Sequence, residues 1–205
     1  MARPREFDET AVLAASAKQF RMHGFADTST EQLCEAAGVR RSSLYNTFIS
    51  KDELFIRSLE WQIAEAMDHQ EAILRRGDLS GHARLAALFE LILQEEEQAQ
   101  GEGHAAGCMI VASRMAPAIG KKEPRIQRLL DSYMTSQLAL VEEAVTAGCL
   151  DGSLRQGLAP GDAALMVATF MSGIRVMSQS GSDISSLRRA ALLHLEALRA
   201  DNRHQ

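Results

Sequence analysis

The sequence predicts an all-α protein, on three observations. First, it is rich in hydrophobic residues (46%) but has few aromatic ones (5%) and only 4 prolines in 205 residues, a composition that favours helices over sheets. Second, apolar residues recur every three to four positions along most of the chain. Third, residues suited to begin a helix and glycines suited to end one separate these apolar stretches.

The same composition limits where the protein can work. The opening MARPREFDET lacks the apolar core of a secretory signal, and no stretch approaches the 18 or so apolar residues of a membrane span. We therefore expect a cytoplasmic protein with no membrane partner. Cys34, Cys108 and Cys149 are an odd number without the spacing of a disulfide framework, so free thiols in a reducing compartment are expected.

Two helices are predicted first. Asp8 is suited to cap a helix over about 9–23, and Gly24 is suited to end it. Thr28 is followed three residues later by Glu31, which is the spacing of a capping box. A short second helix is expected to begin there.

The next two helices follow without a long loop. After a break at Gly38, the segment RSSLYNTF predicts a third short helix, in which Leu44 and Phe48 are four residues apart and face the first two helices. Ser50 and Glu53 form a second capping box, which opens a longer fourth helix.

The rest of the chain continues the helical pattern, giving about nine helices in all. Further helices are expected over about 81–99, 108–116, 124–147, 161–179 and 184–199. Gly148 is expected to end the third of these. The helix over 161–179 is apolar around most of its circumference, so we expect it to pack against another subunit. The sequence thus predicts two domains, residues 1–50 and 51–205.

Charge is distributed unevenly near the N-terminus. The formal net charge is −5, which argues against a nucleic-acid partner for the protein as a whole. The run from Ala36 to Lys51, however, contains no Asp or Glu but includes Arg40 and Arg41. Two short helices joined by a tight turn form a helix-turn-helix arrangement, whose second helix enters the major groove of DNA. The acid-free run is therefore where DNA is expected to lie.

The residues of this region resemble a known family. GFADTSTEQLCEAAGVRRSSLYNTFISKDELF, residues 24–55, is similar to the DNA-binding signature of the TetR family of bacterial transcriptional regulators. The similarity includes the Gly-Phe pair, the Thr cap, the Ala-Gly-Val turn, the Leu-Tyr-x-x-Phe of the third helix and the Ser-Lys-x-x-Leu that opens the fourth. Beyond it, the chain agrees with the family in length and helix pattern only.

The resemblance implies roles for particular residues. Phosphate contacts are implied for Thr28, Tyr45 and Lys51, although Tyr45 is also suited to be a half-buried packing residue. Base edges would be read by the exposed residues of the third helix, namely Arg41, Ser42, Ser43 and Asn46; arginine pairs well with guanine and asparagine with adenine. Arg40 stands where the family usually has a Ser cap, so it is expected to bind a phosphate instead.

The resemblance also implies a homodimer, a palindromic double-stranded operator and a small-molecule inducer. The dimer would form through the last two helices, with Leu165, Phe170, Gly173, Leu192 and Leu195 as interface candidates. Candidates for the inducer pocket are Trp61, Phe89, Met109, Met134 and Met171, because methionine adapts to irregular apolar ligands. The alternative, which the sequence favours for the methionines, is ordinary core packing.

One cysteine is a candidate sensor. Cys108 follows a glycine-rich loop and is expected in the first turn of a helix, where the helix dipole favours a thiolate. His104 is close in sequence and is suited to assist it. The Gly-Cys pair at the start of this helix also resembles a subset of TetR-type regulators that respond to oxidants or electrophiles. The alternative is a buried structural cysteine.

The functional prediction is a dimeric, ligand-responsive transcriptional regulator, acting as a repressor, that a small-molecule or an oxidant or electrophile inducer releases from DNA. The alternative is an architectural or occlusion factor that binds DNA without an inducer. We expect no enzyme and no cofactor, because the sequence has no glycine-rich phosphate loop and no nucleophile with a base. No metal is expected either, since the histidines have no ligand spacing with the cysteines.

Overall fold

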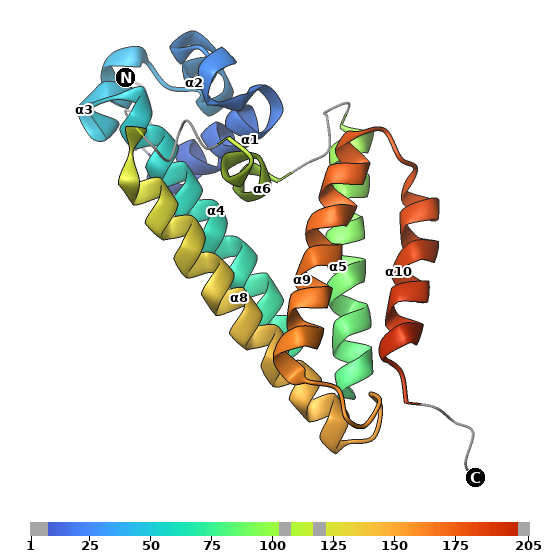
Figure 1. Cartoon of the computed structure of the whole chain (residues 1–205). Coiled ribbons are helices and arrows are strands. Elements are labelled where there is room, and N and C mark those ends of the chain that lie inside the picture. The colour runs from blue at the N-terminus through green and yellow to red at the C-terminus, as the bar shows by residue number, and fades with distance from the viewer. Residues whose placement is uncertain (1–7, 103–107, 117–121, 201–205) are drawn as a thin grey trace. The chain divides into compact units, whose positions relative to one another are not determined.

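The structure is a computed structural model of the chain and describes residues 8–102, 108–116 and 122–200 (Figure 1). These ranges contain nine helices and no strand, apart from one isolated bridge between Leu154 and Arg199. The helices are α1 (Glu9–Asp27), α2 (Thr30–Ala37), α3 (Arg41–Phe48), α4 (Lys51–Leu74), α5 (Gly81–Gly101), α6 (Met109–Arg114), α8 (Pro124–Leu150), α9 (Pro160–Gln179) and α10 (Ile184–Leu198). The predicted all-α class is confirmed. None of the described helices is long and apolar enough to span a bilayer.

The chain forms two compact units, each made of two segments. Unit 1 comprises Met1–Glu65 and Cys108–Leu129, and unit 2 comprises Ala66–Gly107 and Leu130–Gln205. The unit that holds the helix-turn-helix therefore continues past residue 50, where we expected a boundary, and includes a second segment from the middle of the chain. Both α4 and α8 begin in unit 1 and end in unit 2.

Helix α1 begins and breaks where the sequence predicted. The Asp8 side chain accepts a hydrogen bond from the Ala11 amide at 3.1 Å, which caps the helix. Gly24 has φ 77° and ψ 170°, a conformation that a residue with a Cβ rarely adopts. The chain makes one more helical turn to Asp27 before α2.

Aromatic residues fill the core of unit 1 around α1. The centres of the Phe20 and Phe25 rings lie 5.0 and 5.1 Å, respectively, from the centre of the Phe55 ring. Both pairs meet edge to face, an arrangement that aromatic pairs favour. Helix α6 packs against α1, and its first residues Met109 and Ile110 are buried. The second segment of unit 1 thus helps to support the helix that carries the helix-turn-helix.

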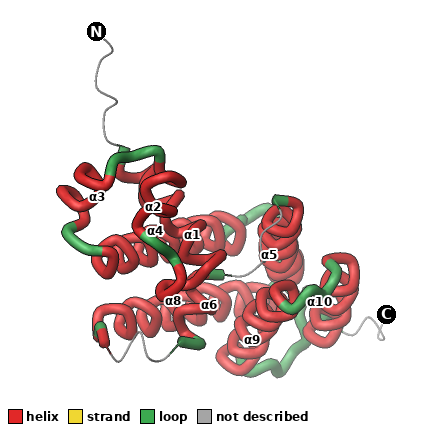
Figure 2. Tube along the Cα trace, turned by 90° about the horizontal axis from the view of Figure 1, so that it is seen from above, coloured by secondary structure: helices red, strands yellow, loops and turns green. Residues whose placement is uncertain are grey.

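In unit 2, helices α5, α9 and α10 pack against one another, and Figure 2 shows them as three neighbouring helices. Their apolar faces form one core that includes Leu88, Phe89, Val167 and Leu195. Burial of these side chains is the main stabilising contribution to unit 2.

The start of α5 is held by residues far away in the sequence. The Gly81 amide donates to the Asp151 carboxylate at 2.8 Å, and the His82 amide donates to the Ser153 hydroxyl at 3.0 Å. Ser80 accepts from the next amide, that of Ala83. Three amides that a helix start leaves without partners are therefore satisfied.

The end of α8 differs from the prediction. Gly148 does not end the helix, which continues to Leu150. A Cβ on Gly148 would lie 2.5 Å from a methyl carbon of Leu154, and one on Gly81 would lie 2.3 Å from the Gly148 Cα. The glycine at 148 therefore allows close packing against Gly81 and Leu154 rather than a helix stop.

Candidate nucleic-acid interface

Helices α2 and α3 form the predicted helix-turn-helix. Gly38, which follows α2, has φ 64° and ψ 30°, the left-handed conformation that ends a helix tightly. Leu33 of α2 and Leu44 and Phe48 of α3 are buried, so these three side chains fix the packing of the two helices. The remaining faces of α3 are left for contact with a partner.

The residues predicted to read bases lie on or near the exposed side of α3. Arg41, Ser42 and Asn46 are exposed, whereas Ser43 is half-buried. Arg40 precedes α3, is exposed, and makes no side-chain capping bond. The structure therefore brings two guanidinium groups and one amide to one short helix.

Arg41 is held in place by neighbours on both helices. Its Nη1 donates to the Glu31 carboxylate at 3.0 Å, and its guanidinium carbon lies 5.6 Å from the centre of the Tyr45 ring. The Tyr45 hydroxyl shares a hydrogen bond of 2.9 Å with the Thr30 hydroxyl. An exposed ion pair of this kind contributes little, so a phosphate or a guanine edge can replace Glu31 as the partner of Arg41.

Lys51 begins α4 and lies beside the end of α1. Its Nζ lies 3.5 Å from the Ala26 carbonyl oxygen and 4.7 Å from the centre of the Phe25 ring. The ammonium group is only half-buried. It is therefore fixed on the rim of unit 1 and can still meet an anion.

The capping box of α2 was predicted one residue too early. The cap is Ser29, whose hydroxyl accepts from the Gln32 amide at 3.2 Å while the Gln32 side chain accepts from the Ser29 amide at 2.7 Å. Thr28 is instead 1% exposed and donates to the Gly24 carbonyl at 2.6 Å. A DNA contact by Thr28 stays a prediction. Thr30, which the sequence did not single out, presents its hydroxyl to Tyr45.

The candidate sensor residues are only partly described. Cys108 directly precedes α6 rather than lying in its first turn, is half-buried, and makes no side-chain capping bond. His104 lies outside the described residues. Across the described ranges, no three His, Cys, Asp or Glu side chains gather into a metal site.

The five candidate pocket residues divide between the two units. Met109 lines a pocket of about 300 Å³ in unit 1, together with Phe20 and His23. Phe89 and Met171 are buried in the core of unit 2. Trp61 and Met134 are half-buried. A common inducer pocket for these five residues stays a prediction.

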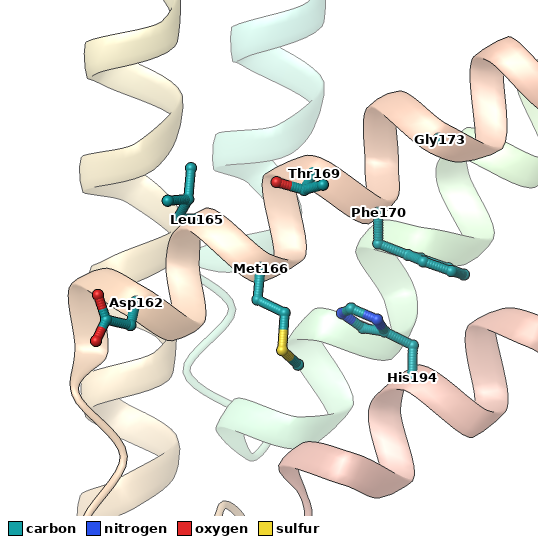
Figure 3. Close-up of a pocket in the computed structure, with 7 residues that line it drawn as sticks. All are labelled: Asp162, Leu165, Met166, Thr169, Phe170, Gly173 and His194. Atoms are coloured by element: carbon teal, nitrogen blue, oxygen red, sulfur yellow. The ribbon is translucent and has the colours of Figure 1, made fainter.

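The candidate dimer residues lie mostly on an apolar groove of unit 2. The groove has a volume of about 650 Å³ and is lined by six residues of α9, including Leu165, Phe170 and Gly173, and by His194 of α10 (Figure 3). The His194 and Phe170 rings stack with their centres 4.3 Å apart. Leu192 is 59% exposed, whereas Leu195 is buried in the core of unit 2. Leu195 therefore packs beneath the exposed surface of α10 instead of lying on it.

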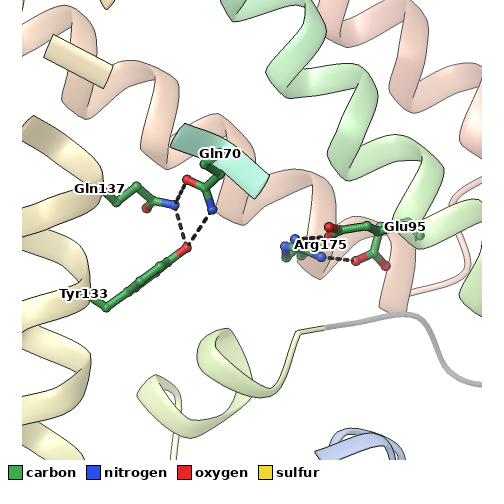
Figure 4. A network of polar contacts seen from close by, with 6 residues as sticks. Gln70, Glu95, Tyr133, Gln137 and Arg175 are labelled. Carbon is green, nitrogen blue, oxygen red and sulfur yellow. Dashed lines mark hydrogen bonds and ion pairs between the residues drawn. The ribbon is translucent and has the colours of Figure 1, made fainter. Parts of the chain in front are cut away.

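Unit 2 also contains buried polar residues that the sequence did not reveal (Figure 4). The Gln137 side chain donates to Gln70 at 2.9 Å and to the Tyr133 hydroxyl at 2.6 Å. Arg175 of α9 pairs with Glu95 at 2.6 Å and with Glu96 at 2.8 Å. Glu96 lies in an acidic stretch of α5 and is nevertheless only 1% exposed.

Known proteins share this arrangement. Residues 12–57 match the family described as bacterial regulatory proteins, tetR family. The HTH-type transcriptional repressor ComR of Escherichia coli K12 is 36% identical over 90 residues, which are 44% of this chain and 43% of ComR. The alignment thus spans less than half of that relative. The HTH-type transcriptional repressor BdcR, also of Escherichia coli K12, is 23% identical over 96% of this chain and 92% of its own length.

Solved structures agree with the fold over nearly the whole chain. A cysteine mutant of the TetR family regulator CifR, complexed with 26-base-pair operator DNA, has a TM-score of 0.75 at 22% identity, covering 96% of this chain and all of CifR. The reduced form of Escherichia coli NemR has a TM-score of 0.77 at 21% identity, covering 94% of this chain and 98% of NemR.

The helices α1, α2 and α3 with their exposed arginines define a helix-turn-helix protein. The matched residues are more specific: residues 12–57 match the tetR family of bacterial regulatory proteins, and the chain has the fold of solved TetR family regulators.

Proposed function

We propose that the protein is a dimeric transcriptional repressor that binds a palindromic operator. The observation that carries the proposal is the surface of α3, where Arg41, Ser42 and Asn46 are exposed while Leu44 and Phe48 are buried. A helix of this kind, held from behind by two others, is the element that reads the major groove.

The residues of the interface divide by chemistry. Arg41 and Asn46 are assigned to base edges, because their side chains can form paired hydrogen bonds with guanine and adenine. Tyr45, Lys51 and Arg40 are assigned to phosphates, which position the protein without reading sequence. Ser42 and Ser43 complete the proposed contact surface.

The apolar groove of unit 2 supports a dimer. Leu165, Met166, Leu192 and Leu193 are all more than a third exposed, and apolar patches of this kind on α9 and α10 mark interaction surfaces. A two-fold dimer presents two copies of α3, so the operator is expected to contain two inverted half-sites.

The signal that releases the protein is proposed to act on Cys108 or on an apolar pocket. Cys108 is half-buried and without a capping bond, so a small oxidant or electrophile can reach it. CifR has been solved as a cysteine mutant with operator DNA, and NemR has been solved in a reduced form. A non-covalent inducer is the alternative.

The test is a footprint of the purified protein on the DNA next to its own gene, with and without a mild oxidant or electrophile. A protected palindrome that is lost on treatment and restored by a thiol supports the repressor and its sensor. The loss should disappear in Cys108→Ser and persist in Cys149→Ser, the matched control. Protection at many unrelated sites without any release would favour an architectural factor instead.

The same DNA separates base contacts from phosphate contacts. Arg41→Ala should relax the preference at one base pair, by about 1–3 kcal/mol. Lys51→Gln should weaken binding to every sequence alike and lower the slope of log affinity against log salt by about one for each site. The reverse result would exchange the two assignments.

A further inference from the structure

Unit 1 contains a second pocket, which shares Phe25, Ala26 and Phe55 with the pocket lined by Met109. Its volume is about 330 Å³, and its walls come from the end of α1, the first turns of α4 and the residues that open α8. Five of its lining side chains are apolar: Phe25, Ala26, Phe55, Ile56 and Ile126. The last three are at most 3% exposed. This volume lies at the lower end of the range for small-molecule sites, about 300–1,000 Å³.

Two ammonium groups lie at this pocket. Lys51 and Lys122 both line it. Lys51 is held against the aromatic wall by the Phe25 ring at 4.7 Å. Lys122 is exposed. Both α4 and α8 begin here, so the positive ends of two helix dipoles add to the charge of the lysines.

Two carboxylates also line the pocket, and one of them is already neutralised. Glu123 accepts from the Arg125 amide at 3.1 Å and from its guanidinium at 3.0 Å. These hydrogen bonds from Arg125 hold the pKa of Glu123 below its ordinary value. The only other lining carboxylate among the described residues is Asp52, which is exposed. Two lysines against Asp52, the carboxylate that Arg125 does not neutralise, leave the pocket positive.

We propose that this pocket binds a small amphipathic anion, such as an aromatic carboxylate. The apolar body would lie between Phe25, Phe55 and Ile126, while the carboxylate would meet Lys51 and Lys122. Such a ligand competes with DNA, because the phosphate contact assigned to Lys51 is then occupied. This regulatory step rests on the proposed function, whereas the binding step does not.

The binding step is tested first, by calorimetry on the full chain without DNA. The probe is 2-naphthoate, and 2-naphthylmethylamine, which has the same ring system and the opposite charge, is its comparison. We expect the naphthoate to bind at least about fivefold more tightly than the amine. Equal affinities would overturn the proposal, because the lysines would then contribute nothing.

Two variants locate the site. Lys122→Gln should weaken naphthoate binding by about fivefold. Arg128→Gln is the matched control, because it removes one positive charge from an exposed residue of α8 that does not line the pocket. Both residues are exposed, and circular dichroism checks that the variants fold. Equal losses in the two variants, or no loss in Lys122→Gln, would place the ligand elsewhere and contradict the proposal.

The regulatory step is tested with a fluorescently labelled operator duplex. Naphthoate should displace the wild-type protein, and Lys122→Gln should need about fivefold more of it. If naphthoate binds but displaces no DNA at saturation, the regulatory step is wrong and the site stands. If the protein binds no duplex at all, the proposed function fails, while the calorimetry still decides whether the pocket binds anions.

Discussion

Glu31 of α2 holds Arg41, the first residue of α3, by an ion pair of 3.0 Å across the turn. The two side chains are 72% and 65% exposed, respectively. Because such a pair contributes little in water, it can orient the guanidinium in the free protein without preventing its transfer to DNA. The same carboxylate, however, brings negative charge to the face that phosphates must approach.

Glu31→Gln is therefore expected to raise the affinity for duplexes of any sequence. We expect an increase of about threefold at low salt, because the repulsion between the Glu31 carboxylate and the phosphates is removed. Fluorescence anisotropy over a series of salt concentrations measures both the affinity and its salt slope. Glu35→Gln, an exposed residue of the same helix, is the control. An unchanged or lower affinity in Glu31→Gln would show that the carboxylate is needed to position Arg41.

The dimer is expected to depend on the exposed apolar side chains of α9 and α10. Leu165→Arg or Leu192→Glu should give folded monomers at micromolar concentration, because a charge on an apolar interface has no partner there. Sedimentation velocity measures the change. Leu150→Glu is the control, since Leu150 is 85% exposed at the end of α8 and does not line the groove. Dimers that persist in both the Leu165→Arg and the Leu192→Glu variant would move the interface to another surface.

Replacing each of two neighbouring glutamates should change the free energy of unfolding by different amounts. Glu96 is 1% exposed and pairs with Arg175, whereas Glu97 is 60% exposed and lies 3.5 Å from Arg188. Glu96→Ala should lower the free energy of unfolding by about 2–3 kcal/mol. This loss is smaller than the loss expected when a fully buried ion pair is broken, because Arg175 retains its ion pair with Glu95. Glu97→Ala should change it by no more than about 0.5 kcal/mol. Urea titration of both variants gives the comparison, and similar losses would disprove the distinction.

The glycine contact between α5 and α8 should not tolerate a methyl group. In Gly81→Ala the new Cβ would lie 2.3 Å from the Gly148 Cα, so the helices must separate at an expected cost of about 2–3 kcal/mol. Gly77→Ala, with nothing within 4 Å of its Cβ, is expected to be neutral or stabilising by up to about 1 kcal/mol. Thermal unfolding distinguishes the two, and equal melting temperatures would mean that the backbone adjusts without strain.

Stability should fall in mild acid because of two histidines. Burial lowers the pKa of His194 below its ordinary value of 6.5. The pKa of His82 is lowered mainly by burial and, to a smaller extent, by the positive charge of Arg199. The unfolded chain therefore takes up protons at a higher pH than the folded protein does. The stability is complete above about pH 6.5 and declines as the pH falls through the folded pKa values. Urea titrations from neutral pH to about pH 5 should show the decline, and His194→Phe should reduce it. An unchanged slope in that variant would leave His82 as its source.

The sequence predicted the parts of the fold that depend on local signals. The bounds of α3, the cap at Asp8 and the helix stop at Gly38 all follow from residues within a few positions of one another. The capping box of α2 shows the limit of this reasoning. Thr28 with Glu31 and Ser29 with Gln32 have the same spacing, and only the burial of Thr28 against the Gly24 carbonyl decides between them.

The features that the sequence did not predict depend on distant partners. A glycine that ends a helix and one that allows close packing look alike in sequence, and Gly148 is the second kind because Gly81 lies beside it. Glu96 is buried because Arg175, 79 residues later, reaches it. Leu192 and Leu195 belong to one apolar stripe, but periodicity alone does not tell which of them faces the core of its own subunit.

The division of unit 1 into Met1–Glu65 and Cys108–Leu129 has a consequence for biosynthesis. A ribosome makes the helix-turn-helix first, yet α6, which packs against α1, emerges only after more than forty intervening residues. Domains made from one continuous segment can fold during synthesis, but this unit must wait for its second segment with part of its apolar core uncovered. A fragment that stops at residue 50 would remain in that unfinished state.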